Sequence, residues 1–102
     1  MQQTLPTTVV EPTVRAVPGV MPMWNVVFHN DNETTMDFVV KVLMRYYGHT
    51  ATRAFEVMMT IHSRGAGIAG TYPLELAELK AQQTVAAARP WFPLKVTLES
   101  AR

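Results

Sequence analysis

Apolar and polar residues alternate in two segments of this chain, one near residue 26 and one near the C-terminus. Residues 23–29 are rich in β-branched and aromatic side chains, and residues 94–99 place Leu94, Val96 and Leu98 between polar residues. A period of two residues is typical of a β-strand with one buried face. We predict strands in both segments, and a third, brief strand in the short apolar piece at 68–70, beside glycines.

Between these strands the spacing of apolar residues changes to three and four, which indicates amphipathic helices. The first helix is predicted over residues 34–47, and Gly48 ends it. Thr34, followed three residues later by Asp37, resembles a capping box at the start of this helix. Its apolar stripe consists of Met36, Val39, Val40, Leu43, Met44 and Tyr47.

Two further helices follow, because helical spacing recurs after Thr50 and after Pro73. The second helix is predicted to end at the glycines 65 and 67, and its inward stripe is expected to contain Ala51, Ala54, Phe55, Met58, Ile61 and His62. The third helix is predicted to run to Ala88, with a buried side made of Leu76, Leu79 and Ala86.

The predicted elements follow one another in the order β-α-α-β-α-β. This order favours an α+β fold, a small three-stranded antiparallel sheet with three helices packed on one face. Residues 1–22 hold four of the seven prolines and show no periodic pattern. We therefore predict a flexible N-terminal tail over residues 1–22 and one core domain over residues 23–102.

The composition narrows the choice of partners and compartment. The 102 residues are 48% hydrophobic and include no cysteine, which suits one domain that folds without disulfides. Nine Lys and Arg nearly balance eight Asp and Glu without a basic run, which argues against a nucleic-acid partner. No apolar stretch approaches the ~20 residues that span a membrane. We expect a monomer in the cytoplasm, without a cofactor.

The residues with the clearest chemistry lie where the first strand meets the first helix. Asn30 and Asp31 offer a fixed anion and several acceptors beside an apolar surface, a combination suited to a protonated amino group. If the fold brings His62 to the same rim, a neutral ring adds a third acceptor for the three ammonium donors. Otherwise a histidine at this position is more commonly a core or edge residue. An apolar pocket beside the rim could be lined by Met36, Val42, Met58, Ile61 and Leu94.

Catalytic interpretations have less support in the sequence. Ser63 follows His62 directly, and adjacent residues on a helix do not face each other, which argues against a serine hydrolase. A metal site made of His29, Asp31 and His62 would lack the close spacing typical of metal-binding motifs. We therefore expect a binding protein rather than an enzyme, and no metal site.

Over about residues 23–99 the sequence resembles the ClpS family, adaptors of the bacterial and plastid N-end rule that pass substrates to the AAA+ unfoldases ClpA or ClpC. In that family a strand ends in Asn-Asp-Asp, followed by aromatic-Thr-Pro-Met-Glu-Phe-Val. Here residues 30–39 read Asn-Asp-Asn-Glu-Thr-Thr-Met-Asp-Phe-Val. Residues 54–62, 75–80 and 93–99 resemble the family's second helix, third helix and last strand, in matching order.

The resemblance implies an adaptor that binds the N-termini of substrate proteins and delivers these proteins to a Clp unfoldase. It implies that Asn30, Asp31 and His62 hold the α-amino group of a bulky hydrophobic first residue. It also implies that Glu75 and Lys80 face the N-domain of ClpA or ClpC, in bacterial cytosol or plastid stroma. The pocket residues implied around the first side chain are Asn32, Thr34, Met36, Val42, Met58, Ile61 and Leu94.

Three positions depart from the family pattern. Asn32 replaces an aspartate, Glu33 replaces an aromatic residue and Thr35 replaces a proline, so the accepted N-terminal residues can differ from the usual Phe, Tyr, Trp and Leu. Two other interpretations stay open at this stage. One is a structural interaction domain similar to the C-terminal domain of a ribosomal stalk protein. The other is a degenerate homologue that docks on the unfoldase without binding N-termini.

Overall fold

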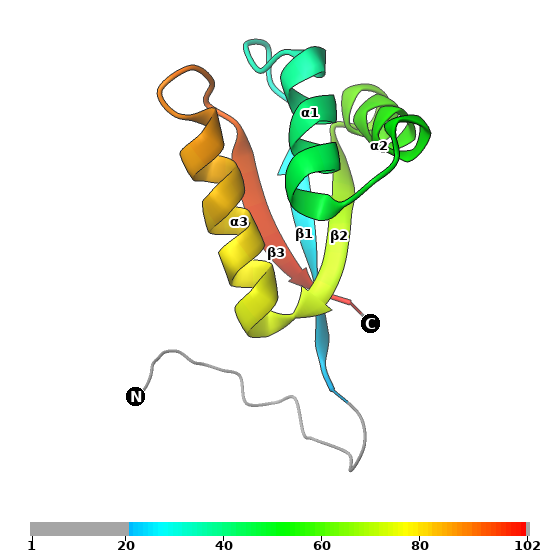
Figure 1. The fold of residues 1–102 in the computed structure, drawn as a ribbon, viewed down its shortest axis with the longest axis vertical. Coiled ribbons are helices and arrows are strands. Elements are labelled where there is room, and N and C mark those ends of the chain that lie inside the picture. Colours follow the sequence, from blue (N-terminus) through cyan, green and yellow to red (C-terminus); the bar gives the residue numbers. More distant parts are fainter. Residues whose placement is uncertain (1–20, 102) are drawn as a thin grey trace.

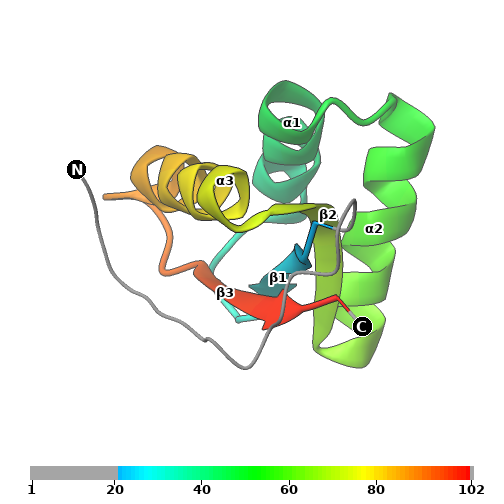
Figure 2. The same cartoon turned by 90° about the horizontal axis from the view of Figure 1, so that it is seen from below.

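Strand β1 (Met23–His29) lies at the centre of a three-stranded sheet in the computed structural model, which describes residues 21–101. Strands β2 (Ala66–Pro73) and β3 (Lys95–Ser100) pair with it on either side, both antiparallel. Helices α1 (Met36–Tyr47), α2 (Ala51–Arg64) and α3 (Leu74–Ala88) pack on one face of this sheet (Figures 1 and 2).

The fold class and the order of elements predicted from the sequence are confirmed. The tail predicted over residues 1–22 lies almost entirely outside the described residues. Strand β2 is longer than the brief strand predicted at 68–70, because it pairs with β1 along its whole length, from His29↔Ala66 to Met23↔Pro73. The pairing is irregular between Val26 and Val27, where Ala69 is an extra residue of β2.

The core fills the space between the sheet and the three helices. Phe28 and Leu43 are fully buried, and the Phe28 ring meets the Tyr47 ring edge to face at 5.5 Å. The Tyr47 hydroxyl lies 2.6 Å from Oγ1 of the fully buried Thr84 on α3, and Thr84 donates to the Lys80 carbonyl at 2.8 Å. These bonds satisfy the buried hydroxyls and join α1 to α3.

The ends of the first two helices follow the expected cap chemistry, with one correction. Thr35, not Thr34, caps α1, since its side chain accepts from the Phe38 amide at 3.1 Å. Thr34 is unavailable for this role because its hydroxyl donates to Asp31. Thr50 caps α2 as predicted, accepting from the Arg53 amide at 3.1 Å.

The buried stripes of α2 and α3 differ from those predicted. On α2, Ala54, Met58 and Ile61 are buried as expected, together with Val57. Ala51, Phe55 and His62, which were also expected on the inward stripe, are exposed. On α3 the predicted stripe was wrong: Leu76 and Leu79 are 40% and 48% exposed, and the buried residues are Ala77, Thr84 and Ala88. Small side chains face inward on α3 because the helix packs closely against Tyr47 and the sheet.

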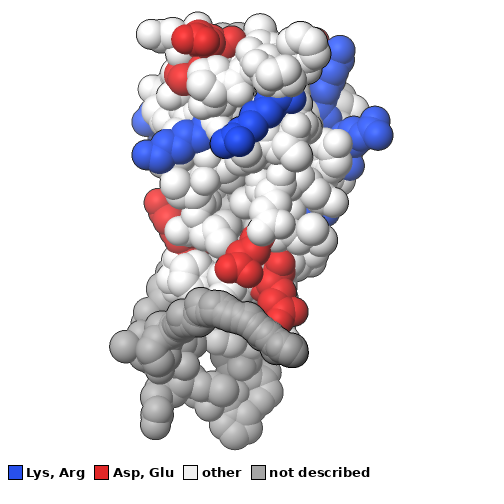
Figure 3. Space-filling view, turned by 90° about the vertical axis from the view of Figure 1, so that its left-hand side faces the viewer, with Lys and Arg blue, Asp and Glu red and all other residues white. Residues whose placement is uncertain are grey.

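Charged residues are grouped by sign on the face shown in Figure 3. Lys and Arg form a band across the upper middle, with Asp and Glu both above and below it. The acidic residues on both sides limit the positive potential that this band could offer to a phosphate backbone. Among the described residues, no helix combines the length and the apolar character required to cross a bilayer.

The buried Tyr47 hydroxyl gives the fold a testable pH dependence. Burial raises the pKa of Tyr47 to about 12 from 10.0, with the bond to Thr84 opposing this effect and Tyr72 adding to it. As pH rises from 10 towards 12, the unfolded chain loses its phenolic proton before the folded protein does. The free energy of unfolding should therefore fall over this range.

We expect Tyr47→Phe to make that fall shallower. At neutral pH the variant should unfold with about 1 kcal/mol less free energy, because Thr84 loses a buried hydrogen-bond partner. Urea denaturation of both proteins at several pH values up to about 12 measures the two effects. Equal slopes in both proteins would show that Tyr47 is not the group that titrates.

Candidate functional site

One backbone hydrogen bond holds the end of β1 against the end of α2. The Asn30 amide donates to the Gly65 carbonyl at 2.9 Å, directly after the last β1–β2 pair, His29↔Ala66. Gly65 ends α2 with φ of 90°, a left-handed conformation that favours glycine, and this turns the chain directly into β2. The two ends that carry Asn30 and His62 are thereby held at the same rim.

The loop after β1 is organised around the Asp31 carboxylate. Its Oδ1 accepts from the backbone amides of Glu33 at 2.8 Å and Thr34 at 2.6 Å, and its Oδ2 accepts from the Thr34 hydroxyl at 2.7 Å. Slight burial raises the pKa of Asp31, but these bonds outweigh that effect and hold the pKa below its ordinary value of 3.8. Asp31 is therefore a fixed anion at neutral pH.

A cavity of about 360 Å³ opens between this loop, the start of α1 and the end of α2. Ligand pockets commonly hold about 300–1,000 Å³, so this cavity suits one large side chain. Val39 and Ile61, which are 6% and 3% exposed, supply buried apolar surface. The lining residues are Asn30, Asp31, Asn32, Glu33, Thr34, Thr35, Met36, Val39, Met58, Ile61 and His62.

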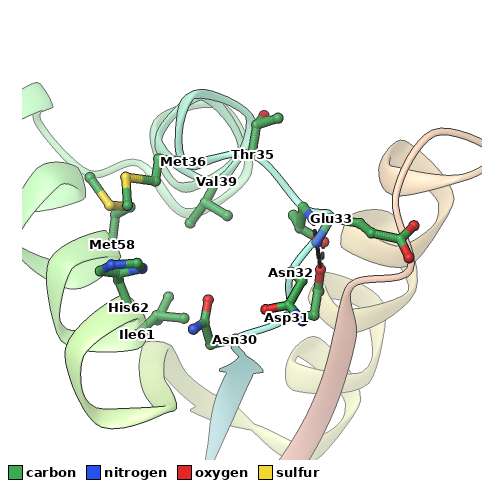
Figure 4. Close-up of a pocket in the computed structure, with 11 residues that line it drawn as sticks. Asn30, Asp31, Asn32, Glu33, Thr35, Met36, Val39, Met58, Ile61 and His62 are labelled. Carbon is green, nitrogen blue, oxygen red and sulfur yellow. Dashed lines mark hydrogen bonds between the residues drawn. The ribbon is translucent and has the colours of Figure 1, made fainter.

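Figure 4 shows how the polar residues are arranged around the cavity. His62 lies on one side with Met36 and Met58, and Asp31 lies on the opposite side. Asn30 stands between the two sides, while the Glu33 carboxylate points away from the cavity. A cation in this cavity would thus meet Asn30 and His62 close to the apolar side chains, facing the fixed charge of Asp31.

The structure brings most of the predicted site residues together, with two exceptions. Val42 and Leu94, expected in the pocket, do not line the cavity; they are core residues, 3% and 6% exposed. Val39 lines the cavity instead, and it follows Met36 by three residues, so helical spacing could have indicated it. The predicted residues that line the cavity are Asn30, Asp31, Asn32, Thr34, Met36, Met58, Ile61 and His62.

The other histidines lie away from this cavity. His29 Nε2 is 2.8 Å from the Thr97 hydroxyl, so its side chain bridges β1 and β3. His49 is half-buried and donates from Nε2 to the Ala69 carbonyl at 2.6 Å. Within residues 21–101 no group of three or more His, Cys, Asp or Glu side chains is arranged to hold a metal ion.

The two residues predicted to face an unfoldase both lie on α3. Glu75 is exposed in the first turn of this helix. The Lys80 ammonium donates to the Tyr46 carbonyl at 2.5 Å and lies 5.9 and 5.7 Å from the ring centroids of Tyr47 and Tyr72. Lys80 therefore has a structural role as well, because it ties α3 to the C-terminal end of α1.

An α+β domain with hydrogen-bond acceptors around an apolar cavity is typical of a small ligand-binding domain. Residues 20–97 match the family model described as ATP-dependent Clp protease adaptor protein ClpS. The chain belongs to this family.

Relatives and a solved structure agree with this assignment. The ATP-dependent Clp protease adapter protein ClpS of Lawsonia intracellularis is 46% identical over 78 residues, covering 76% of this chain and 72% of the relative. That of Desulforapulum autotrophicum is 45% identical over 82 residues, covering 79% of each. The structure of Agrobacterium tumefaciens ClpS2 bound to L-phenylalaninamide superposes with a TM-score of 0.75 at 28% identity, covering 78% of this chain and 98% of that one.

Proposed function

We propose that this protein is an N-degron adaptor. Its cavity binds the free α-amino group and the bulky hydrophobic side chain of a substrate's first residue, and the protein delivers that substrate to a Clp AAA+ unfoldase. One observation carries this proposal: Asn30, Asp31 and His62 line the same cavity as Val39, Met58 and Ile61. The solved relative that is bound to L-phenylalaninamide, a free amine on an aromatic residue, supports it.

The polar rim matches the chemistry of a free N-terminus. A free α-amino group has a pKa of about 7.7–8.0, so near neutrality it is mostly an ammonium with three donors. The Asn30 amide oxygen and an unprotonated nitrogen of His62 can each accept one. An ionised carboxylate offers about four acceptor sites, and the loop uses three on Asp31. Asp31 thus contributes its negative charge and one remaining hydrogen-bond acceptor site.

The apolar part of the cavity accounts for a preference for large side chains. A buried aromatic side chain removes about 150–250 Å² from water, worth roughly 4–6 kcal/mol before ordering costs are subtracted. An internal peptide amide has no charge to offer Asp31, so polypeptide interiors are rejected by the same rim. Binding and release of this kind require no bond to be made or broken, and we propose no catalytic step.

Delivery requires a second surface, for which we propose α3. Glu75 is exposed there and Lys80 lies five residues further along the helix, and these two residues would face the N-domain of ClpA or ClpC. Since the chain contains no cysteine, it fits a reducing compartment, and we propose the cytoplasm, with a monomer as the working form. Membership of the adaptor family weighs against the ribosomal stalk interpretation.

Binding at the proposed site should depend on the positive charge of the ligand. A labelled peptide that begins with Phe should bind with a free N-terminus and should lose binding when the N-terminus is acetylated, as measured by fluorescence anisotropy. His62→Ala should weaken binding about tenfold or more, since a hydrogen bond to a charged group contributes roughly 1.5–3 kcal/mol. Ser63→Ala, at the adjacent exposed position, is the matched control and should bind normally.

Equal binding of free and acetylated peptides would contradict the proposed function. Binding to the unfoldase without binding to any N-terminal peptide would instead indicate the degenerate homologue.

Gly67 sets the position of one side of the cavity. A Cβ atom at this position of β2 would lie 2.8 Å from Cγ1 of Ile61 and 3.4 Å from the Ile61 backbone nitrogen. Real Cβ contacts are essentially never that short, so a side chain at position 67 would force Ile61 to move. Because the Ile61 side chain both meets this Cβ position and lines the cavity, we expect its movement to narrow the space for the bound side chain.

We therefore expect Gly67→Ala to change the selectivity of the site. Affinity for peptides beginning with Phe or Trp should fall about tenfold more than affinity for peptides beginning with Leu. Gly48→Ala is the control: its Cβ would meet nothing within 4 Å, while its φ of 70° makes the substitution destabilising. An equal loss for all peptides in Gly67→Ala would mean that the residue affects only stability.

The delivery surface can be tested separately from the cavity. Glu75→Lys should weaken binding to the N-domain of ClpA or ClpC about tenfold and leave peptide affinity unchanged, because the residue lies outside the cavity. Glu56→Lys makes the same charge change on α2, on the other side of α1 (Figure 1), and should leave N-domain binding unchanged. Surface plasmon resonance with the isolated N-domain measures the first effect; normal N-domain binding by Glu75→Lys would exclude this residue from the interface.

A further inference from the structure

Exposed apolar side chains gather along the outer side of the α1–α2 hairpin. Met36 and Met44 on α1 are 44% and 42% exposed, and Phe55 and Met59 on α2 are 56% and 38% exposed. Val40, half-buried, lies between the two methionines of α1. Residues four apart share one helix face, so 36, 40 and 44 form one row and 55 and 59 another. We call these five residues the hairpin strip.

The two rows lie on neighbouring helices that cross rather than run side by side (Figures 1 and 2). Only residues 48–50 connect α1 to α2, so Met44, near the end of α1, and Phe55, near the start of α2, both lie towards this connection. Met36 and Met58 lie together at the cavity (Figure 4). On α1, Phe38 packs against Phe92, and the Tyr46 carbonyl accepts from Lys80. These contacts mark the face of α1 that is turned towards α3, and the row 36, 40 and 44 lies on a different face of the helix.

The strip carries no formal charge, and two ion pairs lie beside it, while Arg45, which follows Met44, lies over the Tyr46 ring. Lys41 lies 3.1 Å from Asp37, and Arg53 lies 3.2 Å from Glu56. Single exposed apolar residues are ordinary on protein surfaces, but a continuous apolar row beside a ligand cavity is typical of an interaction site.

We propose that the hairpin strip binds apolar side chains of the substrate that follow its first residue, an inference that rests on the proposed function. Met36 belongs both to the cavity lining and to the strip, so the two surfaces are continuous. A chain whose first side chain fills the cavity therefore finds the strip next to it. From Met36 to Met44 a helix rises about 12 Å, which matches about four residues of extended chain.

The composition of the strip suits the binding of apolar side chains of different shapes. Three of its five residues are methionines, whose flexible thioethers adapt to partners of different shape. The absence of charge on the strip means that an acidic or basic substrate residue would lose hydration there without gaining a partner. The adaptor should therefore favour substrates with Leu, Val, Ile or Phe at about positions two to five.

The test uses three ligands and the full chain. Two peptides of equal length begin with Phe and carry either Leu and Val or Ser and Asn at positions three to five. The third ligand is L-phenylalaninamide, which is too short to extend beyond Met36 to the rest of the strip. The wild type should bind the apolar peptide about tenfold more tightly than the polar one. The double variant Phe55→Ser with Met59→Gln should bind both peptides alike and L-phenylalaninamide as the wild type does. Leu79→Gln, an exposed position on α3, is the matched control and should preserve the peptide preference.

Each other outcome overturns the proposal in a distinguishable way. Equal binding of the two peptides, with L-phenylalaninamide bound, excludes the strip and leaves the proposed function intact. No binding of L-phenylalaninamide to the wild type overturns both. Loss of L-phenylalaninamide binding in the double variant means that Phe55 and Met59 only support the cavity. A concentration-dependent dimer in sedimentation that the double variant abolishes assigns the strip to a second copy of the chain.

Discussion

The hydrogen bond between the Asn30 amide and the Gly65 carbonyl, at 2.9 Å, is the constraint on which the site depends. It extends the β1–β2 pairing by one step into the loop, and so fixes where the strand stops relative to the helix that precedes β2. The left-handed conformation of Gly65 makes this possible, because α2 can end there and turn at once into β2. Without this contact Asn30 and His62 would belong to two independent chain ends.

Hydrogen bonds also fix the loop that follows. The Asp31 carboxylate accepts three hydrogen bonds from its own loop, which hold its pKa low and keep the carboxylate in place. A charge fixed before the ligand arrives needs little reorganisation when an ammonium binds. On the opposite side of the cavity, Ile61 is also held in place, but by close packing against Gly67 instead of by hydrogen bonds. Both halves of the site are therefore preorganised.

The arrangement of the helices separates the tasks of an adaptor. The cavity and the hairpin strip belong to α1, α2 and the loop before them, whereas Glu75 lies on α3 (Figure 1). The two parts are joined through α1, whose Tyr47 bonds Thr84 and whose last turn accepts from Lys80. On the function that we propose, a substrate and an unfoldase would occupy different surfaces of one core at the same time.

The sequence by itself determined the order of elements, the α+β class and most of the cavity lining, because alternation, helical spacing and caps such as Thr50 and Gly65 are local signals. It could not determine which side of a weakly amphipathic helix faces inward: Leu76 and Leu79 are exposed while Ala77 and Thr84 are buried. Nor could it separate Val39, which lines the cavity, from Val42, which lies in the core, since both are apolar residues of one helix. Those choices depend on how closely α3 and the sheet approach α1, and only the tertiary structure sets these distances, through contacts between residues far apart in the chain.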